Sequence, residues 1–157
     1  MLLKYVEGLH ESPFAVQKLL PYAAEASWVT GKWEVLNKYL SILPLDVAGD
    51  FNMTIGHLLG ALHRHDMEAF TGTIESLRES IACRLSGPTT DSIHACHDAT
   101  LRLHVLTDLE MIAGTSKETE RNQVLESLGR RLEVIGAHPN DKQYLLGIRR
   151  AAMQLAR

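Results

Sequence analysis

Hydrophobic positions recur every three or four residues along nearly the whole chain, and this spacing predicts helices. One clear example begins at Met67, and its later apolar positions share one helix face. They are Phe70, Ile74, Leu77, Ile81 and Leu85. No stretch alternates between apolar and polar residues for long enough to form a convincing strand. The predicted fold class is therefore all-α.

Proline and glycine divide the first part of the chain. Ser12 followed by Pro13 suits a helix start, because serine caps free backbone N–H groups and proline fits the first turn. Pro21 lies inside the apolar pattern, so we predict a kink or a break there, with a new helix to about residue 30. Gly31 should make the next turn, and Pro44 should stop the helix that follows.

Turn signals also separate the later helices. Five more helices are expected, at about residues 52–64, 67–86, 91–114, 120–137 and 141–157. Asp91 is the expected cap of the third of these, and Gly114 its expected end. Because the turns are short, consecutive helices should form antiparallel hairpins.

A shift of 34 residues aligns part of the chain with itself, and this is the period of the tetratricopeptide repeat. The shift places Trp28 over Leu62 and Leu40 over Ile74. We therefore predict one helical-repeat segment over residues 1–157, with hairpins stacked as a tetratricopeptide-like α-solenoid. The structural core is expected to contain Trp28, Gly31 as the turn, Trp33, Leu36, Tyr39, Phe70, Leu77 and Leu101. Replacing Trp33 with alanine should then unfold the segment by a few kcal/mol.

Composition narrows the functional classes. Hydrophobic residues make up 45% of the chain, charged residues 22%, and the net charge is −3. No basic field attracts nucleic acid, and no apolar run is long enough to span a membrane. The N-terminus does not have the pattern of a signal peptide, so an intracellular protein is expected, with Cys83 and Cys96 as reduced thiols.

Histidines are the main candidates for metal binding. His94, His97 and His104 would share one helix face, with Cys96 nearby, but Leu101 lies between them and favours a packing surface. A second group, His57, His63 and His65, spreads over different sides of a short helix and is typical of a solvated helix end. We expect no metal site.

No catalytic or cofactor-binding motif is recognisable, so we expect neither catalytic residues nor a cofactor. Phosphate-binding loops, a nucleophile elbow and the catalytic-loop motifs of kinases are all missing from the sequence. Asp108 and Glu110 are two positions apart, so they should point to different sides of their helix. Two basic doublets, residues 130–131 and 149–150, favour solvated faces and salt bridges over phosphate binding.

Several stretches together resemble one known family. PYAAEASWVTGKWEVLNKYL is followed in order by HDMEAFTGTIESLRESIA, SIHACHDATLRLHVLTDLEMI and RRLEVIGAHPNDKQYLLGIRRAAMQLAR. From about residue 19 to 157, this series resembles the FAT domain of the phosphatidylinositol-3-kinase-related protein kinases, in particular the fungal ATR-type checkpoint kinases. The motifs are packing motifs, so the order of the series carries the resemblance.

The resemblance implies a non-catalytic scaffold that is part of a FAT domain in a large nuclear serine/threonine kinase. Expected partners are the kinase domain and neighbouring solenoid of the same parent chain, a partner subunit, and a second copy of the segment. No membrane and no direct nucleic-acid contact are expected. Two other hypotheses remain: a free-standing peptide-binding adaptor with Trp28 and Tyr39 in a groove, and a small metalloenzyme built on His94, His97 and His104.

Overall fold

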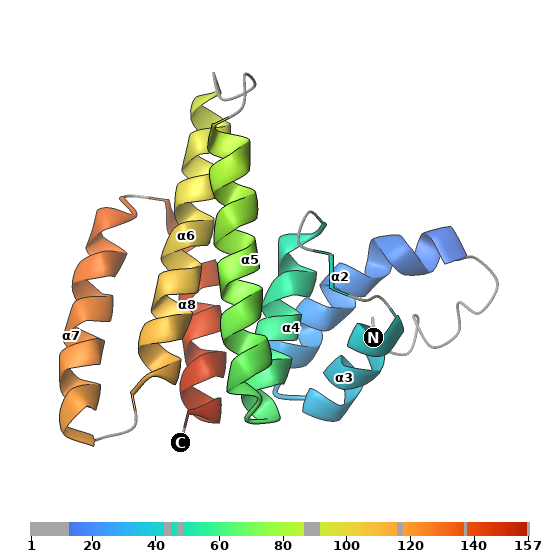
Figure 1. Ribbon diagram of the computed structural model, residues 1–157, viewed down its shortest axis with the longest axis horizontal. Coiled ribbons are helices and arrows are strands. Elements are labelled where there is room, and N and C mark those ends of the chain that lie inside the picture. Colours follow the sequence, from blue (N-terminus) through green and yellow to red (C-terminus); the bar gives the residue numbers. More distant parts are fainter. Residues whose placement is uncertain are drawn as a thin grey trace. The chain divides into compact units, whose positions relative to one another are not determined.

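The structure is a computed structural model that describes residues 13–42, 45–46, 49–86, 92–115, 118–136 and 138–156. Every regular element in these ranges is a helix (Figure 1), which confirms the predicted all-α class. The helices are α2 (Pro13–Val29), α3 (Trp33–Ile42), α4 (Phe51–His63), α5 (Met67–Leu85), α6 (Ile93–Ala113), α7 (Glu118–Val134) and α8 (Pro139–Leu155). The chain divides into two compact units, Met1–Thr73 and Ile74–Arg157.

In the first unit, α2, α3 and α4 pack against one another. The predicted restart after the loop is confirmed at α4, where the Asp50 carboxylate accepts hydrogen bonds from the backbone N–H of Asn52 at 2.8 Å and of Met53 at 3.3 Å. Asn52 also donates from Nδ2 to Glu25 of α2 at 3.1 Å, which ties the start of α4 to the neighbouring helix. The predicted roles of Ser12, Pro44 and Asp91 lie outside the described residues.

A kink or a break was predicted at Pro21, and the structure excludes the break, because α2 continues from Pro13 through Pro21 to Val29. Proline lacks the backbone N–H that would donate to the carbonyl four residues earlier, and in a helix interior this costs about 3 kcal/mol. Leu20, Ala23 and Ala24 flank the proline and are fully buried. Their burial offsets the cost, so packing overrides the local preference.

Two glycines on α4 allow α3 to approach it closely. A Cβ added at Gly56 would lie 3.3 Å from Leu40 and 3.4 Å from Leu36, both on α3. A Cβ at Gly60 would lie 3.1 Å from Leu40. The four-residue spacing places both glycines on the face that receives the two leucines.

Gly31 makes the predicted turn between α2 and α3, with a φ of +69°. Lys32 N–H closes the turn by donating to the carbonyl of Ser27 at 2.8 Å. Only glycine adopts this left-handed conformation without steric cost.

Replacing Gly31 with alanine is expected to destabilise the protein by about 1–2 kcal/mol, because a Cβ strains the left-handed backbone although the space around it is open. Gly72→Ala is the matched control: this glycine lies inside α5, also has open space, and should gain about 0.5–1 kcal/mol in helix propensity. Urea denaturation measures both changes. Two losses of the same size would contradict the role of the turn.

The structure buries most of the predicted core residues but not all. In the first unit Trp28, Leu36, Tyr39 and Phe70 are at most 2% exposed, and Leu77 in the second unit is 3% exposed.

Trp33 and Leu101 were expected in the core, but both are only partly buried in the structure. The Trp33 ring stacks on His63, with ring centroids 5.5 Å apart and planes 20° from parallel. It therefore covers the edge of the α3–α4 contact, and Leu101 likewise lies at an edge beside His97 and His104.

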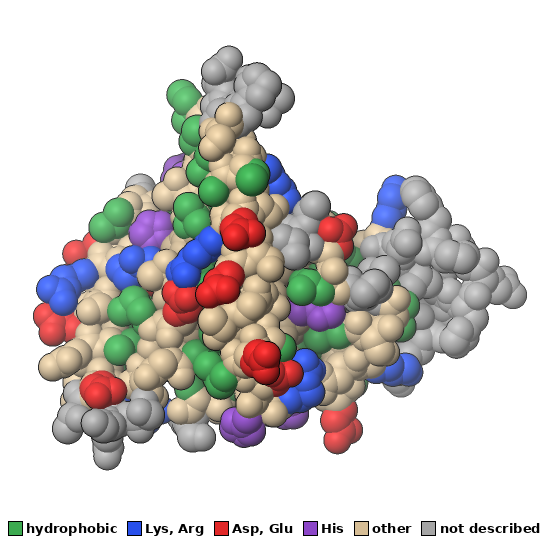
Figure 2. All heavy atoms as spheres, in the orientation of Figure 1, with side chains coloured by type: hydrophobic (Ala, Val, Ile, Leu, Met, Phe, Trp, Pro, Cys, Tyr) green, Lys and Arg blue, Asp and Glu red, His purple; other side chains and the backbone are tan. Residues whose placement is uncertain are grey.

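The second unit contains most of α5 together with α6, α7 and α8, and α6 packs against both α7 and α8. Arg78 of α5 donates from Nη1 to Glu110 of α6 at 2.7 Å. Gly114 ends α6 as predicted, and Pro139 occupies the first turn of α8. On the face seen in Figure 2, acidic and basic side chains are interspersed, without a field of one sign.

Candidate functional site

A buried carboxylate, Asp108, joins the three helices α6, α7 and α8 of the second unit. Asp108 lies on α6 and is 1% exposed, and Arg149 on α8 is 4% exposed. Arg149 donates to Asp108 Oδ2 from Nε at 2.9 Å and from Nη2 at 2.7 Å. The third donor of Arg149, Nη1, binds the backbone carbonyl of Leu128 on α7 at 2.9 Å.

Arg131 of α7 completes the group, which we call the ionic cluster: His104, Asp108, Arg131 and Arg149. Its Nε donates to Asp108 Oδ1 at 2.6 Å, so both carboxylate oxygens are bound. Its Nη2 lies 3.0 Å from His104 Nδ1 and 3.4 Å from the His104 carbonyl. Since a guanidinium can only donate, Nδ1 of His104 must be the acceptor and the ring proton lies on Nε2.

The ionic cluster fixes how the three helices meet. Removing ions from water costs several kcal/mol each, and this cost is recovered only when the charges are paired and their hydrogen-bonding atoms are satisfied. Arg149 meets this condition through Asp108 and Leu128, whereas Arg131 keeps 27% of its side chain exposed and holds the second positive charge near solvent. Any sliding of one helix would leave a buried charge unpaired, so the cluster specifies one arrangement.

The pKa of His104 is lowered from its ordinary value of 6.5. Burial is the largest cause, because it disfavours the charged ring, and the positive charge of Arg131 adds to it. Asp108 acts in the opposite direction and Arg149 lowers the pKa further. The ring therefore stays neutral in the folded protein at a pH where it is protonated in the unfolded chain.

We expect the free energy of unfolding to fall as the pH decreases from about 6.5, because protonation of His104 then favours the unfolded chain. Chemical denaturation at several pH values between 8 and 5 measures this slope. His104→Asn keeps an acceptor for Arg131 and removes the titrating ring, so its slope should be smaller.

Glu25 in the first unit has a raised pKa, caused by burial and then by Asp50, so its contribution to stability is lost as the pH rises. Its effect is common to both proteins and cancels in the comparison of wild type with His104→Asn. Equal slopes for the two proteins would contradict the role of His104.

The ionic cluster was missed by motif reasoning, although the sequence contains a signal for it. Asp108 falls on the apolar stripe of α6, between Val105 and Ile112, and all three are buried. Arg149 lies among buried positions of α8 in the same way, next to Ile148. A charged residue on a buried stripe requires a buried partner, because an unpaired charge there is too costly.

In each of the two basic doublets, one arginine points into the protein and the other is exposed. Arg131 and Arg149 turn inward to Asp108, and their neighbours Arg130 and Arg150 are exposed. The predicted preference for salt bridges is therefore correct for one member of each doublet. The predicted separation of the α6 carboxylates is also correct, since Asp108 binds Arg149 while Glu110 binds Arg78.

The candidate metal ligands have other contacts or lie apart. His97 Nε2 is 2.9 Å from Asp141 on α8, its ring centroid is 5.2 Å from that of His138, and His104 faces Arg131. His94 is exposed. Among the residues that the structure describes, no group of three or more His, Cys, Asp or Glu side chains is placed to hold a metal ion.

Trp28 and Tyr39, which the adaptor hypothesis places in a peptide-binding groove, do not line a groove. Trp28 and Tyr39 are each 2% exposed and pack in the core. In the second histidine group, His63 and His65 are exposed and His57 is partly buried.

Within the described residues, none of the helices combines the length and apolar character that a membrane span requires.

A comparison of the chain with curated proteins gave no match, and a comparison with solved structures gave none either. A sequence model of the FAT domain family matches residues 20–157, which extends from α2 to the end of α8. The FAT domain is a non-catalytic helical scaffold region of phosphatidylinositol-3-kinase-related proteins. With a match over most of its length and an all-helical fold, this chain belongs to the FAT domain family.

Proposed function

We propose that the chain is a scaffold segment of an ATR-type serine/threonine checkpoint kinase, which braces the kinase domain and mediates contacts in DNA-damage signalling. The observation that carries this proposal is the FAT-domain match across residues 20–157. The ordered series of motifs that resembles ATR-type kinases supports the narrower assignment.

Bracing requires helices that keep their arrangement when a partner pulls on them. In the second unit, the ionic cluster gives α6, α7 and α8 one mutual arrangement, through five hydrogen bonds from Arg131 and Arg149 that end on Asp108, Leu128 and the ring of His104. In the first unit, close packing at Gly56 and Gly60 holds α3 on α4. These features suit a part that transmits force or position rather than one that performs chemistry.

The proposal includes the partners and the location that the resemblance implies. The partners would be the kinase domain and adjoining solenoid of the parent protein, a partner subunit, and a second copy of the same segment. The parent protein would act in the nucleus.

The first test is the reading frame, which should encode a kinase domain with a D-F-G motif in the same parent protein. The second test introduces Asp108→Asn into that parent protein and measures phosphorylation of kinase substrates after DNA damage. Loosening the helices should reduce this phosphorylation. Glu110→Gln should not, because Glu110 lies on the same helix but belongs to a pair whose side chains are 36% and 37% exposed. Full damage-induced phosphorylation with Asp108→Asn, despite a lowered melting temperature of the segment, would contradict the proposal.

A further inference from the structure

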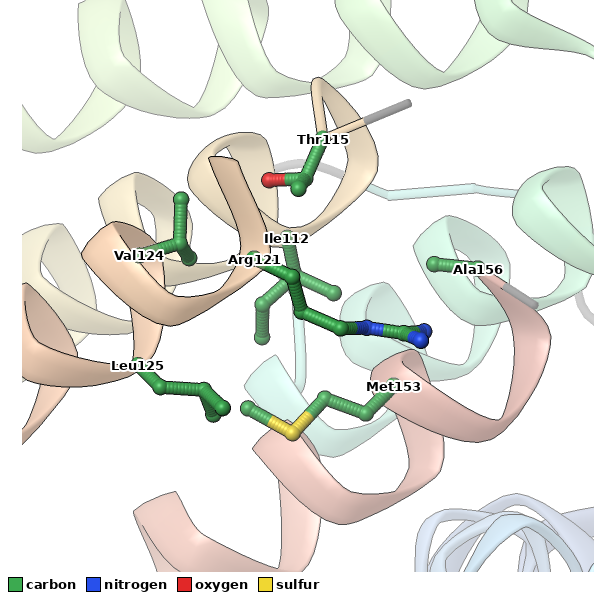
Figure 3. A pocket seen from close by; sticks show the side chains of 7 residues that line it. All are labelled: Ile112, Thr115, Arg121, Val124, Leu125, Met153 and Ala156. Atoms are coloured by element: carbon green, nitrogen blue, oxygen red, sulfur yellow. The ribbon is translucent and has the colours of Figure 1, made fainter. Parts of the chain in front are cut away.

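An apolar cavity of about 250 Å³ opens in the second unit where the end of α6, the start of α7 and the end of α8 meet. Figure 3 shows Leu125 of α7 and Met153 of α8 pointing toward each other across it. Its lining is formed by Ile112, Thr115, Arg121, Val124, Leu125, Met153 and Ala156. Leu125 is 46% exposed, so a large apolar side chain at the rim remains in contact with solvent.

Arg121 is the charged residue of this lining. Its side chain reaches from α7 across the cavity toward Ala156, which directly follows α8 (Figure 3), and it is exposed. It forms no ion pair with any residue in the described ranges. A cation next to apolar surface is complementary to a ligand that carries an apolar group and a negative charge close together.

The size of the cavity limits what it can hold. Small-molecule sites usually enclose about 300–1,000 Å³ and bury most of the ligand. This cavity is smaller and open between helices, so it fits one or two side chains of a larger partner. A groove between helices that receives apolar side chains is a common way to bind an amphipathic helix.

We propose that this cavity is a docking site for an acidic amphipathic helix of a partner protein. One large apolar side chain of that helix enters between Leu125 and Met153, and a carboxylate one turn away pairs with Arg121. The inference deepens the proposed scaffold role by naming a contact surface, and it rests on that role for the existence of a partner.

The test uses the full 157-residue chain and designed peptides. An alanine-rich helical peptide of about 16 residues carries one leucine and, four positions later, glutamate, glutamine or lysine, which lies on the same face. Methyl NMR follows the signals of Met153, Leu125 and Val124 during titration. The glutamate peptide should shift these methyl signals at the lowest concentration and the lysine peptide at the highest, with dissociation constants about fivefold or more apart.

Charge reversal separates a specific contact from general stickiness. Arg121→Glu should invert the preference, so that the lysine peptide binds more tightly than the glutamate peptide. Arg130→Glu makes the same change of charge on the same helix outside the cavity, and it should leave the preference as in the wild type. Leu125→Ala should weaken all three peptides together, whereas Leu146→Ala, at an equally exposed leucine of α8, should not.

The proposal is overturned if no methyl signal shifts at millimolar peptide, or if the three peptides bind equally well. It is also overturned if Arg121→Glu lowers the melting temperature but leaves the binding of the three peptides unchanged. Arg121 would then stabilise the fold by its interaction with the negative C-terminal end of the α8 dipole, and would not bind a partner. These outcomes do not depend on the identity of the parent kinase. If the glutamate peptide binds as expected but Asp108→Asn leaves damage signalling intact, the docking site is supported and the proposed bracing role is contradicted.

Discussion

Replacing Asp108 with alanine should lower the free energy of unfolding by about 3–5 kcal/mol, the largest loss that we expect from a polar residue of this chain. Arg149 is 4% exposed, so without the carboxylate its guanidinium would stay buried and lose two of its hydrogen bonds. Arg131 loses its bond to Oδ1 but can turn to solvent, because it is partly exposed. Urea denaturation followed by circular dichroism measures the loss.

Glu110→Ala is the matched control for Asp108→Ala. Glu110 lies on the same helix and also pairs with an arginine, but Arg78 and Glu110 are 36% and 37% exposed. A pair that is this exposed contributes at most about 1 kcal/mol. Similar losses for the two variants would contradict the special role of burial.

A double replacement separates the loss of the pair from the cost of an unpaired charge. Asp108→Leu with Arg149→Met removes both buried ions and fills their space with apolar groups. Such replacements are often neutral or stabilising, so the double variant should recover much of the stability that Asp108→Ala loses. If it is instead less stable than Asp108→Ala, the attraction between the ions, and not the penalty for isolating one, dominates.

Replacing Trp28 with alanine should cost about 3–5 kcal/mol, since the ring is among the largest fully buried side chains of the described residues. The loss combines the transfer of a large apolar surface to water with the cavity left between α2 and its neighbours. Thermal melting or chemical denaturation of the purified chain measures it.

Trp33→Ala is the comparison that tests the assignment of the two tryptophans. Trp33 is partly exposed and stacks on the exposed His63, so its removal opens no closed cavity. We expect a loss of about 1–2 kcal/mol, less than the full core truncation that the sequence pattern predicts for this residue. A larger loss for Trp33 than for Trp28 would contradict the observed burial.

Local chemistry was sufficient to predict most of the helices. Gly31 and Gly114 are at the predicted helix ends, and the turn at His65 and Asp66 separates α4 from α5 as expected. These features follow from backbone preferences that act over a few residues, and hydrophobic spacing adds the buried face of each helix. Pro21 shows the limit, because the packing of its neighbours outweighed its local preference.

The ionic cluster required knowledge of which helices meet. Arg131 lies 23 residues after Asp108, and Arg149 lies 41 residues after it. No known motif has these spacings, so the sequence alone does not indicate that the three residues meet. The acidic residues on the same helices as the arginines, Glu126 and Glu133 on α7 and Asp141 on α8, lie nearer to them in sequence. Helix packing brought the arginines to a more distant carboxylate, because that carboxylate was buried and needed both charges.

The sequence by itself determined the helical class, the turns and membership of the FAT domain family, since these depend on local propensity and on the order of motifs. Only the tertiary structure decided which charges are buried, that Trp28 is a core residue while Trp33 lies at an edge, and that Arg121 borders an apolar cavity. Burial and ion pairing are properties of surfaces that meet across helices. A single helix pattern specifies the face that will be covered, but not the residue that will cover it.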